Sequence, residues 1–319
     1  MSPAAPQTAA RPAPRTVPLG KRMRRELRVR ALLLLLPVLS RLPRRVALAL
    51  GAACGRLAWF VAPRHRRAAL EHLAIAFPDR DRGWRTRIGR ASFANLGRSA
   101  LELVATQRFD LTRAVHFDPG SLETMTAAHA EGRGVVVISC HLDNWELLAR
   151  RVSAEGLPVA TVAREAQDPR LTALLEKSRG STGIVSLWRN HPGAARGFIR
   201  HLRKGGVVAA LIDQDTEVAG HFVPFFGREA FTPRGPADFA LRMGAAVVFA
   251  RIRRVAPGVH RIRISRLVVP ASGDREADSR ALTAAASAAI EEEVRACPDQ
   301  WVWMHARWRT RPGFNPLNS

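Results

Sequence analysis

The chain has no tyrosine and very little lysine. Only Lys21, Lys177 and Lys204 occur among 319 residues, so 47 of the 50 basic residues are arginines. An arginine excess with abundant alanine and proline is typical of a GC-rich genome, so part of the net charge of +23 carries no function. The rest favours acidic partners such as nucleic acid, anionic lipid or an acidic carrier protein.

Cysteine is also scarce. The three cysteines, Cys54, Cys140 and Cys297, lie far apart and form no C-x-x-C pair, which argues against a cysteine-based zinc site. An odd, sparse set of cysteines fits a reducing compartment. Cys140 precedes His141, but neighbouring strand residues point to opposite faces. A buried structural cysteine is therefore expected rather than a catalytic Cys–His pair.

No apolar run reaches the roughly 20 residues that a transmembrane helix needs. Two shorter stretches, Ala31–Ser40 and Val46–Ala62, each follow a basic segment. This arrangement suits an anionic membrane surface, with arginines at the phosphates and Trp59 and Phe60 at the boundary. Residues 21–63 are therefore predicted to be a membrane-associating helical segment. A buried helical hairpin is the alternative.

The rest of the chain alternates between strand and helix patterns. Residues 1–20 are rich in proline and alanine and are predicted to be a disordered tail. From residue 64 the pattern is helical to about residue 106. Strands are then expected at 135–139, 158–163, 184–187, 207–212, 246–252 and 261–268, and helices at 144–155, 169–179, 193–204, 236–243 and 278–296. This alternation predicts an α/β domain over residues 64–319, with a mostly parallel central sheet flanked by helices.

The most informative segment runs from His141 to Glu146, between an apolar strand and the start of a helical pattern. Open α/β folds bind ligands at such junctions. A neutral imidazole there can take the proton of an alcohol that attacks an ester or thioester, and a nearby carboxylate can fix the ring tautomer. The pair predicts His141 as general base and Glu146 as its acidic partner. The helix N–H groups near residues 143–145 are expected to hold the oxyanion, and Asn144 to contact the substrate.

Two other interpretations of this segment remain open. Asp143 and Glu146 have the spacing of a capping box, in which Glu146 only satisfies backbone donors at the helix start. His141 can equally be a hydrogen-bonded core histidine, which is common after a buried strand.

A second polar segment, Asp213-Gln214-Asp215, follows the strand expected at 207–212. Carboxylates in a D-x-D pattern can bind a divalent metal and a nucleotide diphosphate, as in metal-dependent glycosyltransferases. Without a metal, Asp213 and Asp215 are expected to bond sugar hydroxyls or arginines of the site. A solvated loop is the alternative.

Three further residues are candidates for substrate contact. Phe222–Gly227 holds three phenylalanines in an expected loop, and Phe225 is predicted to line an acyl chain, with core packing as the alternative. Arg164 follows a strand at the same sheet edge as His141, and Arg179 ends the next helix. Either guanidinium suits a phosphate.

Taken in order, these segments resemble the bacterial late acyltransferases of lipid A biosynthesis, the lauroyl and myristoyl transferases of the wider glycerophospholipid acyltransferase superfamily. The resemblance covers residues 42–312 and depends on the ordered set rather than on one motif. The matching segments are Ala76-Phe77-Pro78, residues 141–146, 164–169 with Leu171 and Arg179, 206–215, 222–227 with Thr232 and Gly235, and 303–307.

The resemblance implies transfer of a fatty acyl chain from acyl carrier protein or acyl-CoA to a hydroxyl of a phosphorylated glycolipid, a precursor of lipid A and hence of lipopolysaccharide. It matches His141 to the family's catalytic histidine, Glu146 to its acidic partner, and the segment from Asp213 to one near the acceptor. Members work at the cytoplasmic face of the bacterial inner membrane, without metal or cofactor. Relatives acylate phosphatidylinositol mannosides or lysophospholipids, which remain alternative acceptors.

Direct transfer in a ternary complex is expected, because no activated serine or cysteine elbow is visible. A D-x-D glycosyltransferase is the competing enzyme, and it predicts loss of activity with chelators. A basic binding protein is the alternative without catalysis. Nucleic acid is not an expected partner, because the chain has no helix-turn-helix, zinc or RNP signature.

Overall fold

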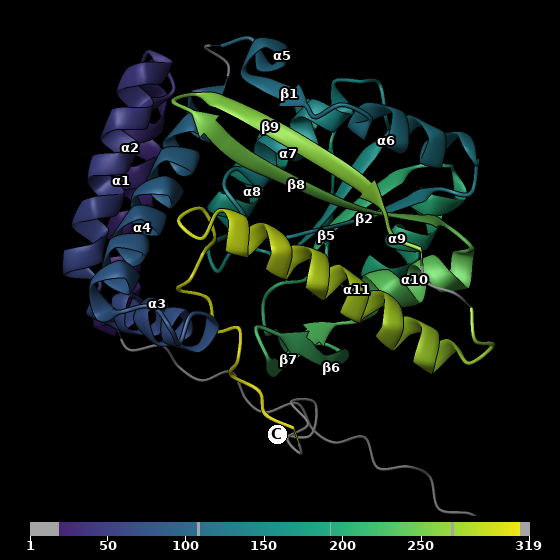
Figure 1. Cartoon of the computed structure of the whole chain (residues 1–319). Coiled ribbons are helices and arrows are strands. Elements are labelled where there is room, and N and C mark those ends of the chain that lie inside the picture. Colours follow the sequence, from purple (N-terminus) through teal and green to yellow (C-terminus); the bar gives the residue numbers. More distant parts are fainter. Residues whose placement is uncertain (1–18, 107–108, 192, 269–270, 313–319) are drawn as a thin grey trace, which may run out of the picture. The chain divides into compact units, whose positions relative to one another are not determined.

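The computed structural model describes residues 19–106, 109–191, 193–268 and 271–312 (Figure 1). Its internal contacts divide the chain into two units, one up to Val38 and one from Leu39 onward. The first unit contains most of α1 (Leu19–Leu39). The tail expected over residues 1–20 lies, except for its last two residues, outside the described residues.

The second unit contains all other helices and strands of the described residues. Its helices are α2 (Arg44–Val61), α3 (Pro63–Ala76), α4 (Arg82–Val104), α5 (Leu111–Ala114), α6 (Ser121–Ala130), α7 (Trp145–Ser153), α8 (Pro169–Gly180), α9 (Ala194–Arg203), α10 (Gly235–Met243) and α11 (Arg275–Ala296). Its strands are β1 (Val115–Phe117), β2 (Val135–Ser139), β3 (Val159–Ala163), β4 (Val185–Trp188), β5 (Val207–Leu211), β6 (Gly220–Phe225), β7 (Arg228–Pro233), β8 (Ala246–Ala256) and β9 (Val259–Arg266).

Seven strands form one sheet in the order β1-β9-β8-β2-β5-β3-β4. Every neighbouring pair is parallel except β8 and β9, which form an antiparallel pair. The predicted mostly parallel sheet flanked by helices is therefore confirmed. The central strands read as nearly continuous valine, isoleucine and alanine because both of their faces are covered.

Alternate residues of the sheet enter two separate cores. Val136 and Ile138 of β2 pack on one side with residues of α9, α10 and α11, whereas Val135 and Val137 pack on the other with residues of α6 and α7. Figure 1 shows α11 crossing one face of the sheet and α6 and α7 on the opposite face. Helices therefore pack on both faces of the sheet and fix the positions of the carboxyl ends of its strands relative to one another.

The helices α2 and α4 cross at very short range. Gly51 and Gly55 of α2 face Gly97 and Ala94 of α4, and a Cβ atom on any of the three glycines would collide with the backbone of the other helix. The helix α2 belongs to the same unit as the sheet. The boundary expected at residue 63, between the membrane-associating segment and the α/β domain, therefore lies inside this unit, between α2 and α3.

The membrane-associating role expected for residues 21–63 stays a prediction. Among the described residues, no single helix is long and apolar enough to cross a membrane. The pair α2 and α3 meets that criterion only jointly, and the two helices are bent by 92° relative to each other.

We expect Gly51→Val to destabilise the fold, because its Cβ would lie 2.8 Å from the carbonyl carbon of Gly97 and 2.9 Å from the Cα of Arg98. Overpacking of this kind should lower the free energy of unfolding by about 3 kcal/mol, which urea denaturation would measure. Ala53→Val, at an exposed position of the same helix, is the matched control. Equal losses in the two variants would contradict the close crossing.

Candidate active site

The register of the sheet brings His141 and Asp213 together. Strands β2 and β5 pair in parallel, with Ser139 opposite Leu211. His141 lies two residues after Ser139, and Asp213 lies two residues after Leu211. Both residues are therefore at the same level, just beyond the carboxyl ends of their strands. Two residues that are 72 positions apart in the chain therefore become neighbours without any contribution from a long loop.

His141 is held by Asp213 at two points. The Asp213 Oδ1 atom lies 2.7 Å from the ring Nδ1, and Oδ2 accepts the backbone N–H of His141 at 2.7 Å. The indole N–H of Trp301 also donates to Oδ2, at 2.7 Å. Burial raises the pKa of Asp213, but the charge of His141 and the hydrogen bonds to the carboxylate outweigh it and lower that pKa to about 2. The ionised carboxylate fixes the proton on Nδ1 and leaves Nε2 as the acceptor.

Neutral polar groups surround the Nε2 atom. The amide nitrogen of Gln214 lies 3.0 Å from Nε2 of His141 and 2.5 Å from Nδ1 of His305. Burial lowers the pKa of His305, and the neighbouring His141 lowers it further, to about 4. His305 is therefore neutral near pH 7. The His141 side chain is 15% exposed, so its ring can be reached from outside.

Glu146 is placed differently from the prediction. Its carboxylate is buried and bonded to Arg179, at 2.5 Å and 3.1 Å. The described contacts of the His141 ring are with Asp213, Gln214 and aromatic neighbours rather than with Glu146. The orienting role predicted for Glu146 is thus filled by Asp213. Arg179, expected to clamp a phosphate, is committed to Glu146.

The capping box, one of the interpretations left open for residues 143–146, does not form. Helix α7 starts at Trp145, so Glu146 is its second residue, and Asn144 stands at the cap without a side-chain hydrogen bond to the helix. Asp143 has a left-handed backbone, with φ of 46°. Its N–H donates to the carbonyl of Gln300, so this group is not free to hold an oxyanion.

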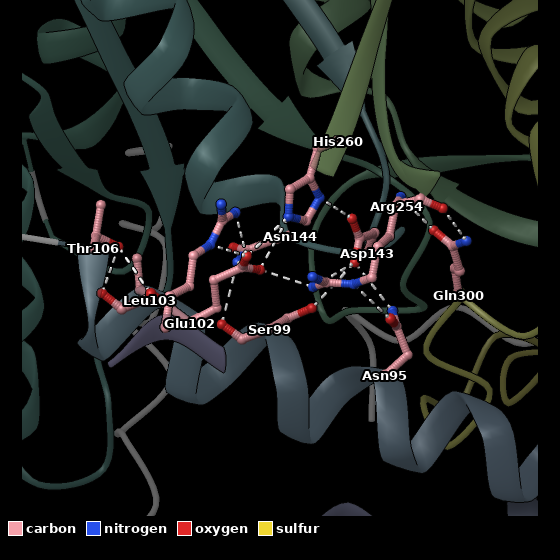
Figure 2. Close-up of polar contacts among 11 residues, drawn as sticks. Asn95, Ser99, Glu102, Leu103, Thr106, Asp143, Asn144, Arg254, His260 and Gln300 are labelled. Carbon is pink, nitrogen blue, oxygen red and sulfur yellow. Dashed lines mark hydrogen bonds and ion pairs between the residues drawn. The ribbon is translucent and has the colours of Figure 1, made fainter. Parts of the chain in front are cut away.

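Asp143 and Asn144 instead join a buried polar network with Glu102 and His260 (Figure 2). The Nδ1 atom of His260 donates to Asp143 at 2.5 Å, and its Nε2 donates to Glu102 at 3.0 Å. Arg254 donates to the same two carboxylates. The amide of Asn144 is bonded to Glu102 and to the carbonyl of Ser99, so its predicted contact with substrate is not supported.

The two carboxylates of this network face cationic side chains from three elements. Burial lowers the pKa of His260, but Asp143 and Glu102 outweigh it and raise that pKa, and a carboxylate at each ring nitrogen favours the imidazolium form. Burial raises the pKa of Glu102, but bonds from His260 and Arg254 lower it well below its usual range. Arg44 of α2 adds a third cation at 2.6 Å from Glu102. The network stabilises the left-handed turn that carries His141.

Two other predicted substrate contacts are structural. Asp215 accepts hydrogen bonds from the N–H and hydroxyl of Thr310, at 2.5 Å and 2.8 Å, and so anchors the C-terminal segment. The two carboxylates of the D-x-D segment therefore serve different partners and do not form a joint ligand. Phe225 lies in the β6–β7 hairpin, not in a loop, and is fully buried against Trp301 and Trp308. It is a core residue, as the alternative interpretation stated.

An apolar pocket of about 260 Å³ begins one residue before Asp213. It extends across the carboxyl ends of three neighbouring strands toward α9 and α10. Its lining includes Ile212, Val162, Leu187, Phe198, Phe239 and Arg189. Burial lowers the pKa of Arg189, and the nearby Arg164, which is exposed, lowers it further. Arg164 thus lies beside the pocket residue Arg189, and its predicted contact with phosphate stays a prediction.

Sequence reasoning did not identify Gln214, Trp301 and His305 as parts of the site. Gln214 stood between two noted carboxylates, and His305 fell in the matching segment 303–307, but neither residue was given a role, and Trp301 was not singled out. The signal that could have found Asp213 as the partner of His141 is the equal offset of each residue from the end of an apolar strand.

The chain is similar to several known acyltransferases. The chain matches the family model of the bacterial lipid A biosynthesis acyltransferases over residues 21–310. It is 26% identical to a lipid A biosynthesis palmitoleoyltransferase of Escherichia coli K12, covering 85% of this chain and 87% of that protein. A lauroyltransferase of the same organism is equally similar, covering 85% and 88%. A phosphatidylinositol mannoside acyltransferase of Mycobacterium tuberculosis is 25% identical, covering 68% of each chain. The chain belongs to the bacterial lipid A biosynthesis acyltransferase family.

Proposed function

We propose that the protein transfers a fatty acyl chain from a thioester donor, acyl carrier protein or acyl-CoA, to a hydroxyl of a lipid A precursor, with His141 as general base. The observation that carries the proposal is the His141–Asp213 pair next to an apolar pocket that starts at Ile212. The printed names of the most similar relatives support a lipid A precursor as acceptor.

In the proposed reaction the acceptor hydroxyl displaces the Gln214 amide from Nε2 of His141. As its oxygen attacks the thioester carbonyl, the hydroxyl proton passes to Nε2, and Asp213 stabilises the imidazolium. The carbon–sulfur bond then breaks, the new carbon–oxygen ester bond remains, and His141 returns the proton to the departing thiolate. The N–H of Trp145, at the first position of α7, has no acceptor within its own helix and is the proposed donor to the oxyanion.

The acyl chain is proposed to occupy the apolar pocket. Its lining is almost entirely aliphatic or aromatic and includes Ile212, which directly precedes Asp213. A chain bound there is therefore proposed to place its carbonyl near His141. Arg164 and Arg189 at the pocket are proposed to contact phosphate, either of the donor or of the acceptor. A location at the cytoplasmic face of the bacterial inner membrane fits the lipid acceptor and the sparse cysteines.

Mass spectrometry of lipids tests this proposal. In cells that lack the gene, complementation with wild type should restore one acyl chain on one lipid class. His141→Ala should fail to restore it, because it removes the proposed general base, and the neighbouring His305, with its pKa lowered to about 4, is a much weaker base. His116→Ala, at an exposed position of β1, is the control and should restore the chain fully.

The same measurement identifies the acceptor. An acyl chain missing from lipid A supports the proposal. An acyl chain missing from a phosphatidylinositol mannoside would instead identify that lipid as the acceptor, as the name of the mycobacterial relative indicates. Full restoration by His141→Ala would overturn the assignment of the general base.

A further inference from the structure

A second hollow lies between α2 and α4, next to their close crossing. Its volume is about 580 Å³, and its lining shares no residue with the apolar pocket. Ala91 and Ala94 form small-residue positions of the lining, and the charged residues around them are Arg56, Arg90, Arg98 and Asp299. Arg90, Ala94 and Arg98 are spaced by four residues, so they lie on one face of α4.

The three arginines of this hollow make no direct polar contact with a carboxylate among the described residues. None of their guanidinium groups has a hydrogen bond or an ion pair with another residue that the structure describes. Arg90 is instead positioned over the ring of Phe60, at 5.3 Å. Burial lowers the pKa of Arg98, and the nearby Arg254 and Arg56 lower it further, against the opposing effect of Asp299 and Asp143. Three like charges that face one hollow, with Asp299 as the single carboxylate, favour binding of an anion.

The surface beside the hollow indicates which kind of anion would bind there. Leu57, Phe60 and Val61 of α2 are 61%, 58% and 69% exposed, and Val46 and Leu50 continue the exposed apolar row at helical spacing. A helix with exposed apolar side chains bordered by arginines is typical of elements that lie in the boundary between lipid headgroups and acyl chains. A soluble anion would leave this apolar row uncovered.

We propose that the hollow between α2 and α4 binds the phosphate of an anionic glycerophospholipid headgroup while the apolar row of α2 enters the same leaflet. The site is separate from the proposed catalytic residues and does not depend on their chemistry. It would hold the enzyme on an anionic membrane, where a lipid acceptor is found, and would select the headgroup charge of that membrane.

Co-sedimentation of the full-length protein with vesicles tests the proposal. Wild type should bind phosphatidylcholine vesicles that contain phosphatidylglycerol at least about tenfold more tightly than vesicles of phosphatidylcholine alone. The double variant Arg90→Gln/Arg98→Gln should lose about tenfold or more of this affinity, since each arginine at a membrane surface contributes about fivefold. Arg82→Gln/Arg87→Gln removes the same charge from α4 outside the hollow and should lose much less.

A second variant separates a specific site from general attraction. Ala91→Leu fills the hollow without altering net charge, and leucine suits a helix about as well as alanine. It should weaken binding to phosphatidylglycerol vesicles, whereas an effect of overall charge alone would leave binding unchanged and would overturn the proposal. Equal losses in the two double variants would also overturn it.

A soluble ligand tests the choice of anion. Isothermal titration with glycerol 3-phosphate should give no saturable binding comparable to that of vesicles. If the protein bound glycerol 3-phosphate saturably but did not bind phosphatidylglycerol vesicles, the ligand of the hollow would be a soluble phosphate ester, and the proposal of a membrane lipid would be overturned. All of these measurements use binding alone, so they stand apart from any failure of the proposed acyl transfer.

Discussion

Replacing Asp213 with asparagine is expected to lower kcat for acyl transfer by about 10³- to 10⁴-fold with little change in KM, by analogy with the loss of the orienting carboxylate in other catalytic histidine sites. The amide would donate a hydrogen bond to Nδ1 of His141, so the ring proton would move to Nε2, where the acceptor hydroxyl must deliver its own. Steady-state kinetics on detergent-dispersed substrates would measure the effect. The change leaves the apolar pocket unaltered, so binding should persist.

Asp215→Asn is the matched control for this prediction. Asp215 is also buried and lies in the same segment, but its partner is Thr310 rather than a catalytic group. Asp215→Asn should lower the melting temperature but leave kcat close to that of wild type. If Asp213→Asn kept kcat within about fivefold of wild type while Glu146→Gln abolished transfer, Glu146 would recover the role that the sequence assigned to it.

Replacing Glu102 with glutamine should lower the free energy of unfolding by about 3–5 kcal/mol, because it leaves buried cations without their shared carboxylate. His260, Arg254 and Arg44 all donate to Glu102. Chemical denaturation at pH 6 would measure the loss. Glu292→Gln, at an exposed position of α11, is the control and should change stability by a few tenths of a kcal/mol.

The pH dependence of stability provides a second measurement of the same network. The pKa of His260 is raised in the folded protein, so the fold binds more protons than the unfolded chain above the unfolded value of about 6.5. Its contribution is complete below that pH and is lost as pH rises through the folded pKa. Glu102→Gln removes one cause of the raised pKa, so its stability should fall less with rising pH than that of wild type. Parallel pH profiles would contradict the ion-pair account of His260.

The sheet could be predicted well because its strands are short, apolar and regularly spaced. The strand expected at 135–139 has those bounds, and the strand expected at 207–212 ends one residue earlier. The helical pattern expected from residue 64 to about residue 106 corresponds to two helices. The first ends before Pro78, which cannot donate a backbone hydrogen bond, and Asp81 caps the second by accepting from the N–H of Trp84.

The β6–β7 hairpin had no recognisable turn signal. Its strands meet at Phe226 and Gly227, which both have positive φ, at 53° and 70°. Positive φ at both central residues suits a hairpin turn, but phenylalanine seldom adopts it, so the sequence resembled an apolar loop. The three phenylalanines proved to be partly or fully buried within this hairpin and the adjoining tryptophans.

Of the catalytic pair, the sequence predicted His141 but not its partner. His141 was found because it follows an apolar strand directly. Its partner was sought by local spacing, which selected Glu146, whereas the contact is made by Asp213 through strand pairing. Local spacing also suggested a helix cap at Asp143, but His260 and Arg254, more than 100 residues away, bind that carboxylate. Contacts of this range depend on tertiary packing, which spacing along the chain does not reveal.

The parallel pairing of β2 with β5 has a consequence for how the enzyme can diversify. Because the ladder of backbone hydrogen bonds sets the distance between His141 and Asp213, the segment after Asp213 is free of that task. Exchanges at Val218 and Ala219, which line the apolar pocket, would therefore reshape the space proposed for the acyl chain without altering the His141–Asp213 pair. Exchanging these two residues between relatives would test whether the preferred acyl chain changes while the catalytic pair is kept.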